Sequence, residues 1–169
     1  MTGRRGKKHL SRRRFVAQVA QAATAGAAVA SAGTALAQSD NRVRGFDHVA
    51  VPMQNTDAMI AFYHGLGFEV RESAVAVTVY VGGQMINFHR PARWQDAAFT
   101  LRAPAARPPS GDFCFVWEGT AAALKAWLDG AKATIVEGPV PRPGGRKVQG
   151  SSVYIRDPDG NLLEFMIYA

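Results

Sequence analysis

Residues 154–164 read YIRDPDGNLLE, and this stretch decides how the C-terminal part of the chain folds. Residues 157–161 supply the aspartate, proline, glycine and asparagine side chains that favour a tight turn. Because residues 152–156 and 162–168 on either side are typical of strands, the sequence predicts a hairpin here.

The elements before this hairpin indicate an internal repeat. One strand, one helix and three strands are expected over residues 46–89, and the same order recurs over residues 112–168. The sequence therefore predicts an α+β domain built from two βαβββ modules. The expected strands are residues 46–52, 68–73, 75–81 and 85–89 in the first unit and 112–117, 134–137, 152–156 and 162–168 in the second.

The composition fits one globular domain. The chain has 169 residues, of which 47% are hydrophobic and 20% charged, which excludes disordered and collagen-like classes. Cys114 is the only cysteine, so no disulfide can form within the chain. Its strand-like surroundings favour a buried thiol or one in a cleft wall over a nucleophile.

The positive charge is confined to the N-terminal segment. The formal charge is +7, and residues 1–37 carry seven Lys and Arg without any Asp or Glu. Residues 38–169 hold the remaining 13 Lys and Arg against all 13 Asp and Glu, so this part is neutral. We therefore expect no nucleic-acid partner.

The first 37 residues are typical of an export signal. Basic residues precede an alanine-rich run, and Ala35-Leu36-Ala37 matches the pattern that signal peptidase reads. Residues 11–15 read SRRRF and resemble a twin-arginine signal. We expect export to the periplasm or the medium, with cleavage after Ala37 and no stable membrane association of the mature protein. A general secretory signal and an uncleaved anchor are the alternatives.

Period-two alternation divides each predicted strand into an apolar and a mixed face. In residues 85–89, Ile86 and Phe88 share the apolar face; in residues 162–168, Leu163, Phe165 and Ile167 do the same. The apolar faces suit packing under the helices. The opposite faces, which suit a cleft, carry His48, Asn87, His89, Asp112 and Glu164.

These motifs together resemble the vicinal oxygen chelate superfamily, which includes glyoxalase, bleomycin-resistance and extradiol dioxygenase proteins. The resemblance rests on residues 46–51 (FDHVAV), on residues 62–68 (FYHGLGF) and above all on residues 154–164. It is closest to the single-domain glyoxalase domain-containing proteins. It implies paired modules forming a curled mixed sheet around a metal-binding cleft. The expected organisation is a signal (1–37), a tether (38–44), module one (45–90), a linker (91–110) and module two (111–169).

The resemblance also implies a site. His48 and Glu164 correspond to metal-ligand positions, and Glu164 is the expected catalytic residue. His89 and Asp112 are further candidate ligands; Asp112 stands where many relatives have a histidine, and either ligates or hydrogen-bonds a partner. Two histidines and a carboxylate suit a divalent ion such as Zn, Ni, Mn or Fe.

Several candidate residues would contact the substrate. These are Asn87, Ser152 and Tyr154, together with a Gly- and Pro-rich loop over residues 139–150 that would lie at the cleft mouth. The chemistry expected from the resemblance is that of a metal-dependent lyase, isomerase or dioxygenase acting on a small substrate with neighbouring oxygens. The alternative is a non-catalytic protein that sequesters a small molecule. The resemblance also implies a homodimer.

Overall fold

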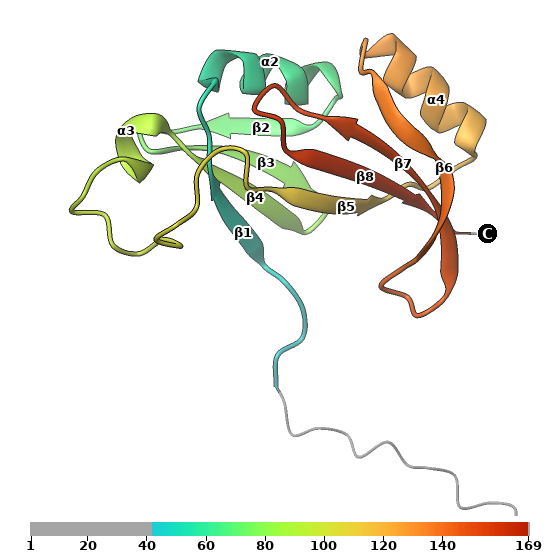
Figure 1. Cartoon of the computed structure of the whole chain (residues 1–169), viewed down its shortest axis with the longest axis horizontal. Helices are drawn as coiled ribbons and strands as arrows, with labels where there is room; N and C mark the ends of the chain where they lie inside the picture. The colour runs from blue at the N-terminus through green and yellow to red at the C-terminus, as the bar shows by residue number, and fades with distance from the viewer. Residues whose placement is uncertain (1–41, 169) are drawn as a thin grey trace, which may run out of the picture. The chain divides into compact units, whose positions relative to one another are not determined.

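The computed structural model describes residues 42–168, so the predicted signal at residues 1–37 lies outside the described residues. Residues 45–169 are grouped as one compact unit. No helix within residues 42–168 has the length and apolar composition needed to cross a membrane. The elements, drawn in Figure 1, are β1 (His48–Pro52), α2 (Thr56–Gly65), β2 (Glu69–Glu72), β3 (Ala76–Val81), β4 (Gln84–His89), α3 (Pro91–Trp94), β5 (Asp112–Val116), α4 (Ala121–Gly130), β6 (Ile135–Pro143), β7 (Gln149–Arg156) and β8 (Leu162–Ile167).

The strands form two four-stranded mixed sheets with the same topology. Their orders are β1-β4-β3-β2 and β5-β8-β7-β6. β1 pairs in parallel with β4, and β5 pairs in parallel with β8. All other neighbouring strands pair antiparallel. The prediction of an α+β fold made of two βαβββ modules is therefore confirmed, with one sheet for each module.

One face of each sheet is buried beneath the helices (Figure 1). Phe88 in β4 and Leu163 in β8 are completely buried, as are Tyr63 in α2 and Leu128 in α4. The apolar faces expected from the alternation are thus the core faces. Aromatic contacts join the two modules into one core, with 5.8 Å between the rings of Phe68 and Phe115 and 6.2 Å between those of Phe88 and Phe113.

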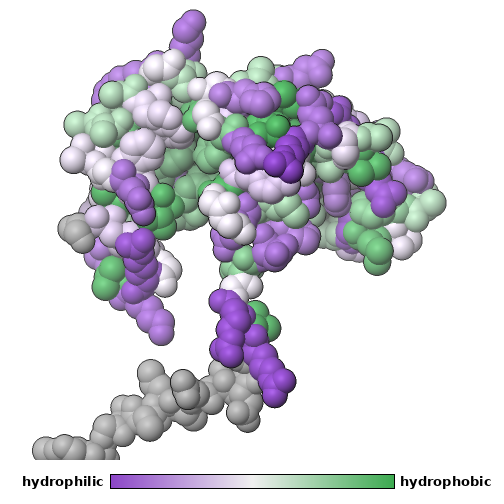
Figure 2. Space-filling model, turned by 180° about the vertical axis from the view of Figure 1, so that it is seen from behind, coloured by the Kyte–Doolittle hydropathy of each residue, from purple (hydrophilic) through white to green (hydrophobic). Residues whose placement is uncertain are grey.

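The outer surface keeps several apolar side chains among its polar ones. Hydrophobic and hydrophilic residues are interspersed in the view of Figure 2. Phe46 is 80% exposed, Leu101 is 87% exposed and Val116, on the mixed face of β5, is 50% exposed. The faces opposite the core are therefore accessible to small molecules or to another protein.

Residues 139–150 correct a prediction, because they are mostly strand and not a loop at a cleft mouth. β6 continues to Pro143 and β7 begins at Gln149, so only five residues connect them. β6 is the edge strand of its sheet. A proline there removes no ladder hydrogen bond on the free side, which is why a Pro-rich segment remains a strand.

The turn at residues 157–161 ties module two to module one. The Tyr63 hydroxyl donates a hydrogen bond of 3.1 Å to Asp157 in this turn. The backbone N–H groups of Gln54 and Asn55 donate to Asp159 over 2.6 and 2.8 Å. The stretch that predicts the hairpin therefore also fixes the β1–α2 connection of the other module.

Candidate functional site

Strand register gives the two modules matched polar positions. His48 is the first residue of β1, and Ala50, two residues further along this strand, pairs with Asn87 in β4. Asp112 is the first residue of β5, and Cys114, two residues further along this strand, pairs with Glu164 in β8. His48 and Asp112 are therefore equivalent positions, as are Asn87 and Glu164.

The His48 imidazole is held by its neighbour. Its Nδ1 atom lies 2.7 Å from a carboxylate oxygen of Asp47, and the His48 side chain is 47% exposed. A carboxylate that fixes one imidazole nitrogen orients the ring and leaves Nε2 for another partner. Among the predicted ligands, His48 is thus already oriented.

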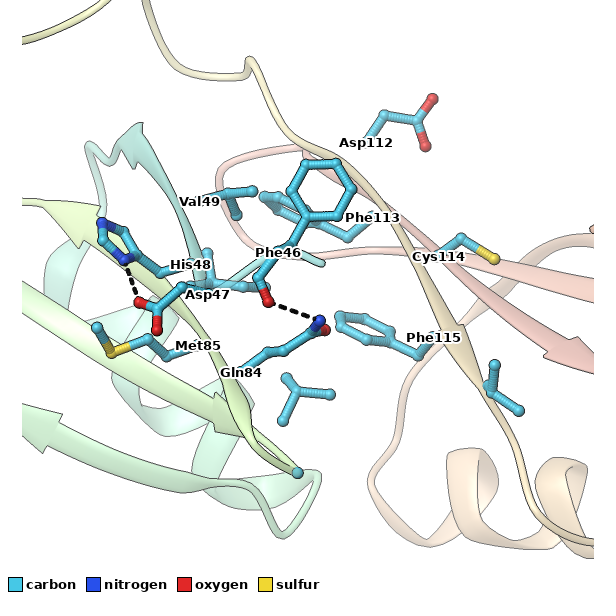
Figure 3. Close-up of a pocket in the computed structure, with 14 residues that line it drawn as sticks. Phe46, Asp47, His48, Val49, Gln84, Met85, Asp112, Phe113, Cys114 and Phe115 are labelled. Carbon is cyan, nitrogen blue, oxygen red and sulfur yellow. Dashed lines mark hydrogen bonds and ion pairs between the residues drawn. The ribbon is translucent and has the colours of Figure 1, made fainter. Parts of the chain in front are cut away.

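His48 and Asp112 both line a hollow of about 560 Å³. Figure 3 shows the two side chains on opposite sides of Phe46, with the Asp112 carboxylate directed away from the imidazole. Apolar side chains dominate the remaining wall: Val49, Val81, Met85, Ile86, Phe113, Phe115 and Val116. This arrangement suits a small organic molecule with an apolar part.

Asp112 and Glu164 line a second hollow of about 340 Å³, on the mixed face of the second sheet. The hydroxyl of Ser152, which is completely buried, donates to Glu164 over 2.5 Å. Tyr154 lines the same hollow. The structure therefore gathers four of the predicted site residues on this face.

Asn87 lies on the corresponding face of the first sheet. Its Oδ1 atom accepts a hydrogen bond of 2.7 Å from the Thr78 hydroxyl on β3. Oδ1 retains a second lone pair, so it can still accept from a substrate or bind an ion.

His89 lies apart from His48. His48 pairs with Met85, and His89 is four residues further along β4, which places it about 13 Å away along the strands. The His89 ring contacts Phe99 instead, at 5.2 Å between centroids. Burial, and secondarily the Arg93 charge, lower the pKa of His89. The structure does not bring the two predicted histidine ligands together.

Cys114 lines the larger hollow, as expected for a thiol in a cleft wall. Burial, reinforced by the nearby Glu164 carboxylate, raises the pKa of the Cys114 thiol to about 12. The nucleophile is the thiolate, so this environment disfavours nucleophilic catalysis by Cys114.

The predicted ligand side chains are of types that bind a divalent ion, but within one chain they do not lie together. Within residues 42–168, no three His, Cys, Asp or Glu side chains lie close enough together to hold a metal ion. His48 and Asn87 belong to one sheet, while Asp112 and Glu164 belong to the other. The predicted metal set stays a prediction.

Sequence reasoning did not single out three residues of the smaller hollow: Glu137, Arg156 and Arg142, the last of which it covered only within the expected loop over residues 139–150. Arg142 donates from Nε to the Tyr154 hydroxyl over 3.1 Å and forms a 3.1 Å ion pair with Glu137. The hydrogen bond that Arg142 donates to the Tyr154 oxygen, and secondarily the Glu137 carboxylate, raise the pKa of Arg142. Arg142 lies in the segment expected to be a loop, so alternation gave no signal for it.

Comparison with known proteins identifies the family of this domain. A family model described as the Glyoxalase/Bleomycin resistance protein/Dioxygenase superfamily matches residues 45–165. The glyoxalase domain-containing protein RDO1 of Mycosarcoma maydis is 34% identical over 129 residues, which cover 75% of this chain and 69% of that protein. The virulence protein STM3117 of Salmonella typhimurium is 35% identical over 124 residues, which cover 72% of this chain and 83% of that protein.

Solved structures agree with this assignment. The crystal structure of STM3117 has a TM-score of 0.66 and 32% identity, covering 75% of this chain and 98% of the other. An integron cassette protein of V. cholerae has the same TM-score with 28% identity, covering 76% and 98% of the two chains. The chain therefore belongs to the Glyoxalase/Bleomycin resistance protein/Dioxygenase superfamily.

Proposed function

We propose that this protein is an exported, metal-dependent enzyme that acts on a small substrate with two neighbouring oxygen atoms. The observation that carries the proposal is the register equivalence of the two modules. His48 and Asn87 lie on the accessible face of the first sheet, and Asp112 and Glu164 lie at the matched positions of the second sheet. A structural protein would gain nothing from polar groups at these four matched positions.

The four side chains supply one imidazole nitrogen and three oxygens. These donors suit Zn, Ni, Mn or Fe, and the two carboxylates balance the charge of a divalent ion. These residues would hold the ion, which would supply Lewis-acid polarisation of two neighbouring substrate oxygens. Glu164 is the proposed proton acceptor, and the Ser152 hydroxyl fixes one of its oxygens in place. His89 is left out of this set because of its distance from His48.

We further propose that two copies of the chain complete the site. Each sheet presents only one pair of donors, and proteins of this fold commonly dimerise. In a homodimer, the first sheet of one copy would oppose the second sheet of its partner. Phe46 and Val116 line the larger hollow and are exposed in the single chain. Exposed apolar side chains of this kind support the proposal that a second copy covers this face.

Metal content and oligomeric state test the proposal together. We expect about one divalent ion per chain in protein purified from metal-supplied cells, measured by inductively coupled plasma mass spectrometry. His48→Ala and Glu164→Ala should each lose most of this ion, while Glu72→Ala, on β2 outside both hollows, should retain it. Wild-type protein that is folded and holds no stoichiometric ion would sink the proposal.

A non-catalytic binding protein is the second candidate function. The largely apolar hollow of about 560 Å³, together with the separation of the donors within one chain, favours it. In that case His48→Ala and Glu164→Ala would leave affinity for a hydrophobic probe such as 8-anilinonaphthalene-1-sulfonate unchanged. A bulky substitution in the hollow, Val116→Trp, would abolish probe binding.

Export to the periplasm or the medium is proposed from the sequence of residues 1–37. Seven basic residues followed by an alanine-rich run and Ala35-Leu36-Ala37 support it. Expression in a bacterium should give a mature N-terminus after Ala37, detectable by intact-mass spectrometry of the periplasmic fraction. Arg12→Lys/Arg13→Lys/Arg14→Lys should retain the protein in the cytoplasm if the twin-arginine route is used.

A further inference from the structure

Strand β6 departs from regular pairing beside the smaller hollow. Its register against β7 shifts between Ile135 and Glu137 and again between Glu137 and Val140. In a regular strand, residues an odd number apart point to opposite faces. Glu137 and Arg142 are five apart, yet both line the same hollow. Bulges of this kind redirect side chains and are common next to active sites.

The redirected Arg142 is held in a fixed position. Its Nε donates to the Tyr154 hydroxyl, one terminal nitrogen donates to Glu137 over 3.1 Å, and the other donates to the Pro141 carbonyl over 3.2 Å. Three of its five N–H donors are therefore used by the described residues. The Arg142 side chain is still 42% exposed, so its two remaining donors are available to a ligand.

Tyr154 also has a free hydrogen-bonding capacity. Because its oxygen accepts from Arg142, its own proton can be donated to another acceptor. Tyr154 and Arg142 line the same hollow as Glu164 and Asp112. A group bound between the guanidinium and the phenol would therefore lie beside the proposed ligands of the ion.

The side chains of the hollow alone carry one more negative than positive charge, and a bound divalent ion would reverse this balance. Its wall carries the carboxylates of Asp112, Glu137 and Glu164 and the guanidinium groups of Arg142 and Arg156. If a divalent ion neutralises Asp112 and Glu164, Glu137 compensates only one of the two arginines. One positive charge then remains for the substrate.

From this geometry we infer that Arg142 and Tyr154 bind the carboxylate of the substrate. The planar guanidinium presents parallel N–H groups that match a carboxylate, and such charge-assisted bonds are the strong ones. The inference rests on the proposed function, in which the ion would bind one carboxylate oxygen and the oxygen on the neighbouring carbon, while Arg142 and Tyr154 hold the other carboxylate oxygen. The substrate class is thus a small carboxylic acid with an oxygen on the neighbouring carbon.

The test compares carboxylates with their uncharged amides. Lactate and mandelate would be titrated against lactamide and mandelamide, with binding followed by chemical-shift changes in ¹H–¹⁵N spectra of the purified protein. In the Zn-loaded protein we expect at least one carboxylate to bind about tenfold more tightly than its amide. Arg142→Gln should reduce this preference to less than about threefold, and Tyr154→Phe should weaken carboxylate binding.

Arg71 offers a matched control. It also pairs with a glutamate, Glu69, and lies 5.2 Å from a tyrosine ring, but on β2 outside the hollows. Arg71→Gln should leave the preference unchanged. If Arg142→Gln does not fold, Arg142→Lys replaces it, because it keeps the charge, loses the planar fork and should still lower the preference.

Two outcomes would overturn the inference: wild-type protein that binds neither carboxylate more tightly than its amide, or a preference that survives in both Arg142 variants. Repeating the titrations after EDTA treatment separates this inference from the proposed function. A carboxylate preference in a protein that takes up no Zn supports the arginine site and contradicts the metal-dependent enzyme. Zn uptake without any preference for the carboxylate supports the metal-dependent enzyme and contradicts the arginine site.

Discussion

Asp159 holds the N-cap residue of helix α2 from the other module: its carboxylate accepts hydrogen bonds from both the backbone N–H and the side-chain amide of Asn55, 104 residues away, over 2.8 and 2.9 Å. Asn55 is the N-cap residue of α2 and makes no side-chain cap of its own. The matching helix α4 is capped locally, by the Thr120 hydroxyl. Module two thus fixes the residue from which α2 begins.

Asp159→Ala should therefore destabilise the whole domain. It removes three hydrogen bonds to a carboxylate at a helix amino end, including the 2.6 Å bond from Gln54, and should cost about 2 kcal/mol in the free energy of unfolding. Urea denaturation checks this value. Asp129→Ala, which breaks only an exposed pair with Lys125, is the control and should cost less than about 0.5 kcal/mol. Equal losses in the two variants would contradict this anchoring role of Asp159.

The buried Asp157 should give the domain a measurable pH dependence. Burial raises the pKa of the Asp157 carboxyl above its ordinary value of 3.8, although hydrogen bonds from Asn161 and Tyr63 oppose the shift. The folded state then binds this proton more tightly than the unfolded chain. The stabilisation is complete below the unfolded pKa and is lost as the pH rises through the folded pKa.

The difference between wild type and Asp157→Asn isolates this contribution. The free energy of unfolding of wild type minus that of the variant should fall as the pH rises from below 3.8, and then become constant. Urea titrations at a series of pH values measure it. A difference that grows with pH would mean that the Asp157 pKa is lowered.

The Cys114 thiol should react slowly although it is solvent-accessible. With its pKa raised to about 12, very little thiolate is present near neutral pH. Alkylation by iodoacetamide should be about 100-fold slower in the folded protein than in urea-unfolded protein. Glu164→Gln should accelerate it, because one source of the raised pKa is the Glu164 carboxylate. Equal rates in folded and unfolded protein would disprove this environment.

The sequence predicted those features that depend on local alternation and turn chemistry. Phe88 and Leu163 are buried because period two placed them on apolar faces, and the turn at residues 157–161 joins two strands as expected. The fold class followed from the order of these elements. His48 and Glu164 were likewise found on mixed faces, because side-chain direction along a regular strand follows from the sequence.

The remaining features depend on pairing between distant residues. His89 alternates correctly onto the mixed face, but its distance from His48 depends on the β1–β4 register, which the sequence does not encode locally. Arg142 escaped notice because prolines suggested a loop, whereas an edge strand tolerates them. The bulges that direct Arg142 toward Tyr154 lie on either side of Glu137, next to Gly138, and this glycine was the one local sign of an irregular strand.

Gly138 is the residue on which the bulged strand depends, and it can be tested against Gly67. Both have a left-handed backbone, with φ of +115° and +82°. A Cβ at Gly67 would meet open space, but at Gly138 it would clash with the backbone oxygen of Ser152. Gly67→Ala should cost about 1 kcal/mol, from conformation alone. Gly138→Ala should cost about 3 kcal/mol or more, because β6 must also move away from β7.

The two glycine variants also differ in their expected effect on the hollow. Displacing β6 in Gly138→Ala moves Arg142 relative to Tyr154, so this variant should lose carboxylate selectivity even at temperatures where it remains folded. Gly67→Ala lies in module one and should retain the selectivity. Thermal denaturation and the amide-matched titrations measure both effects. If Gly138→Ala proved as stable and as selective as Gly67→Ala, the close approach of β6 to β7 would not position Arg142.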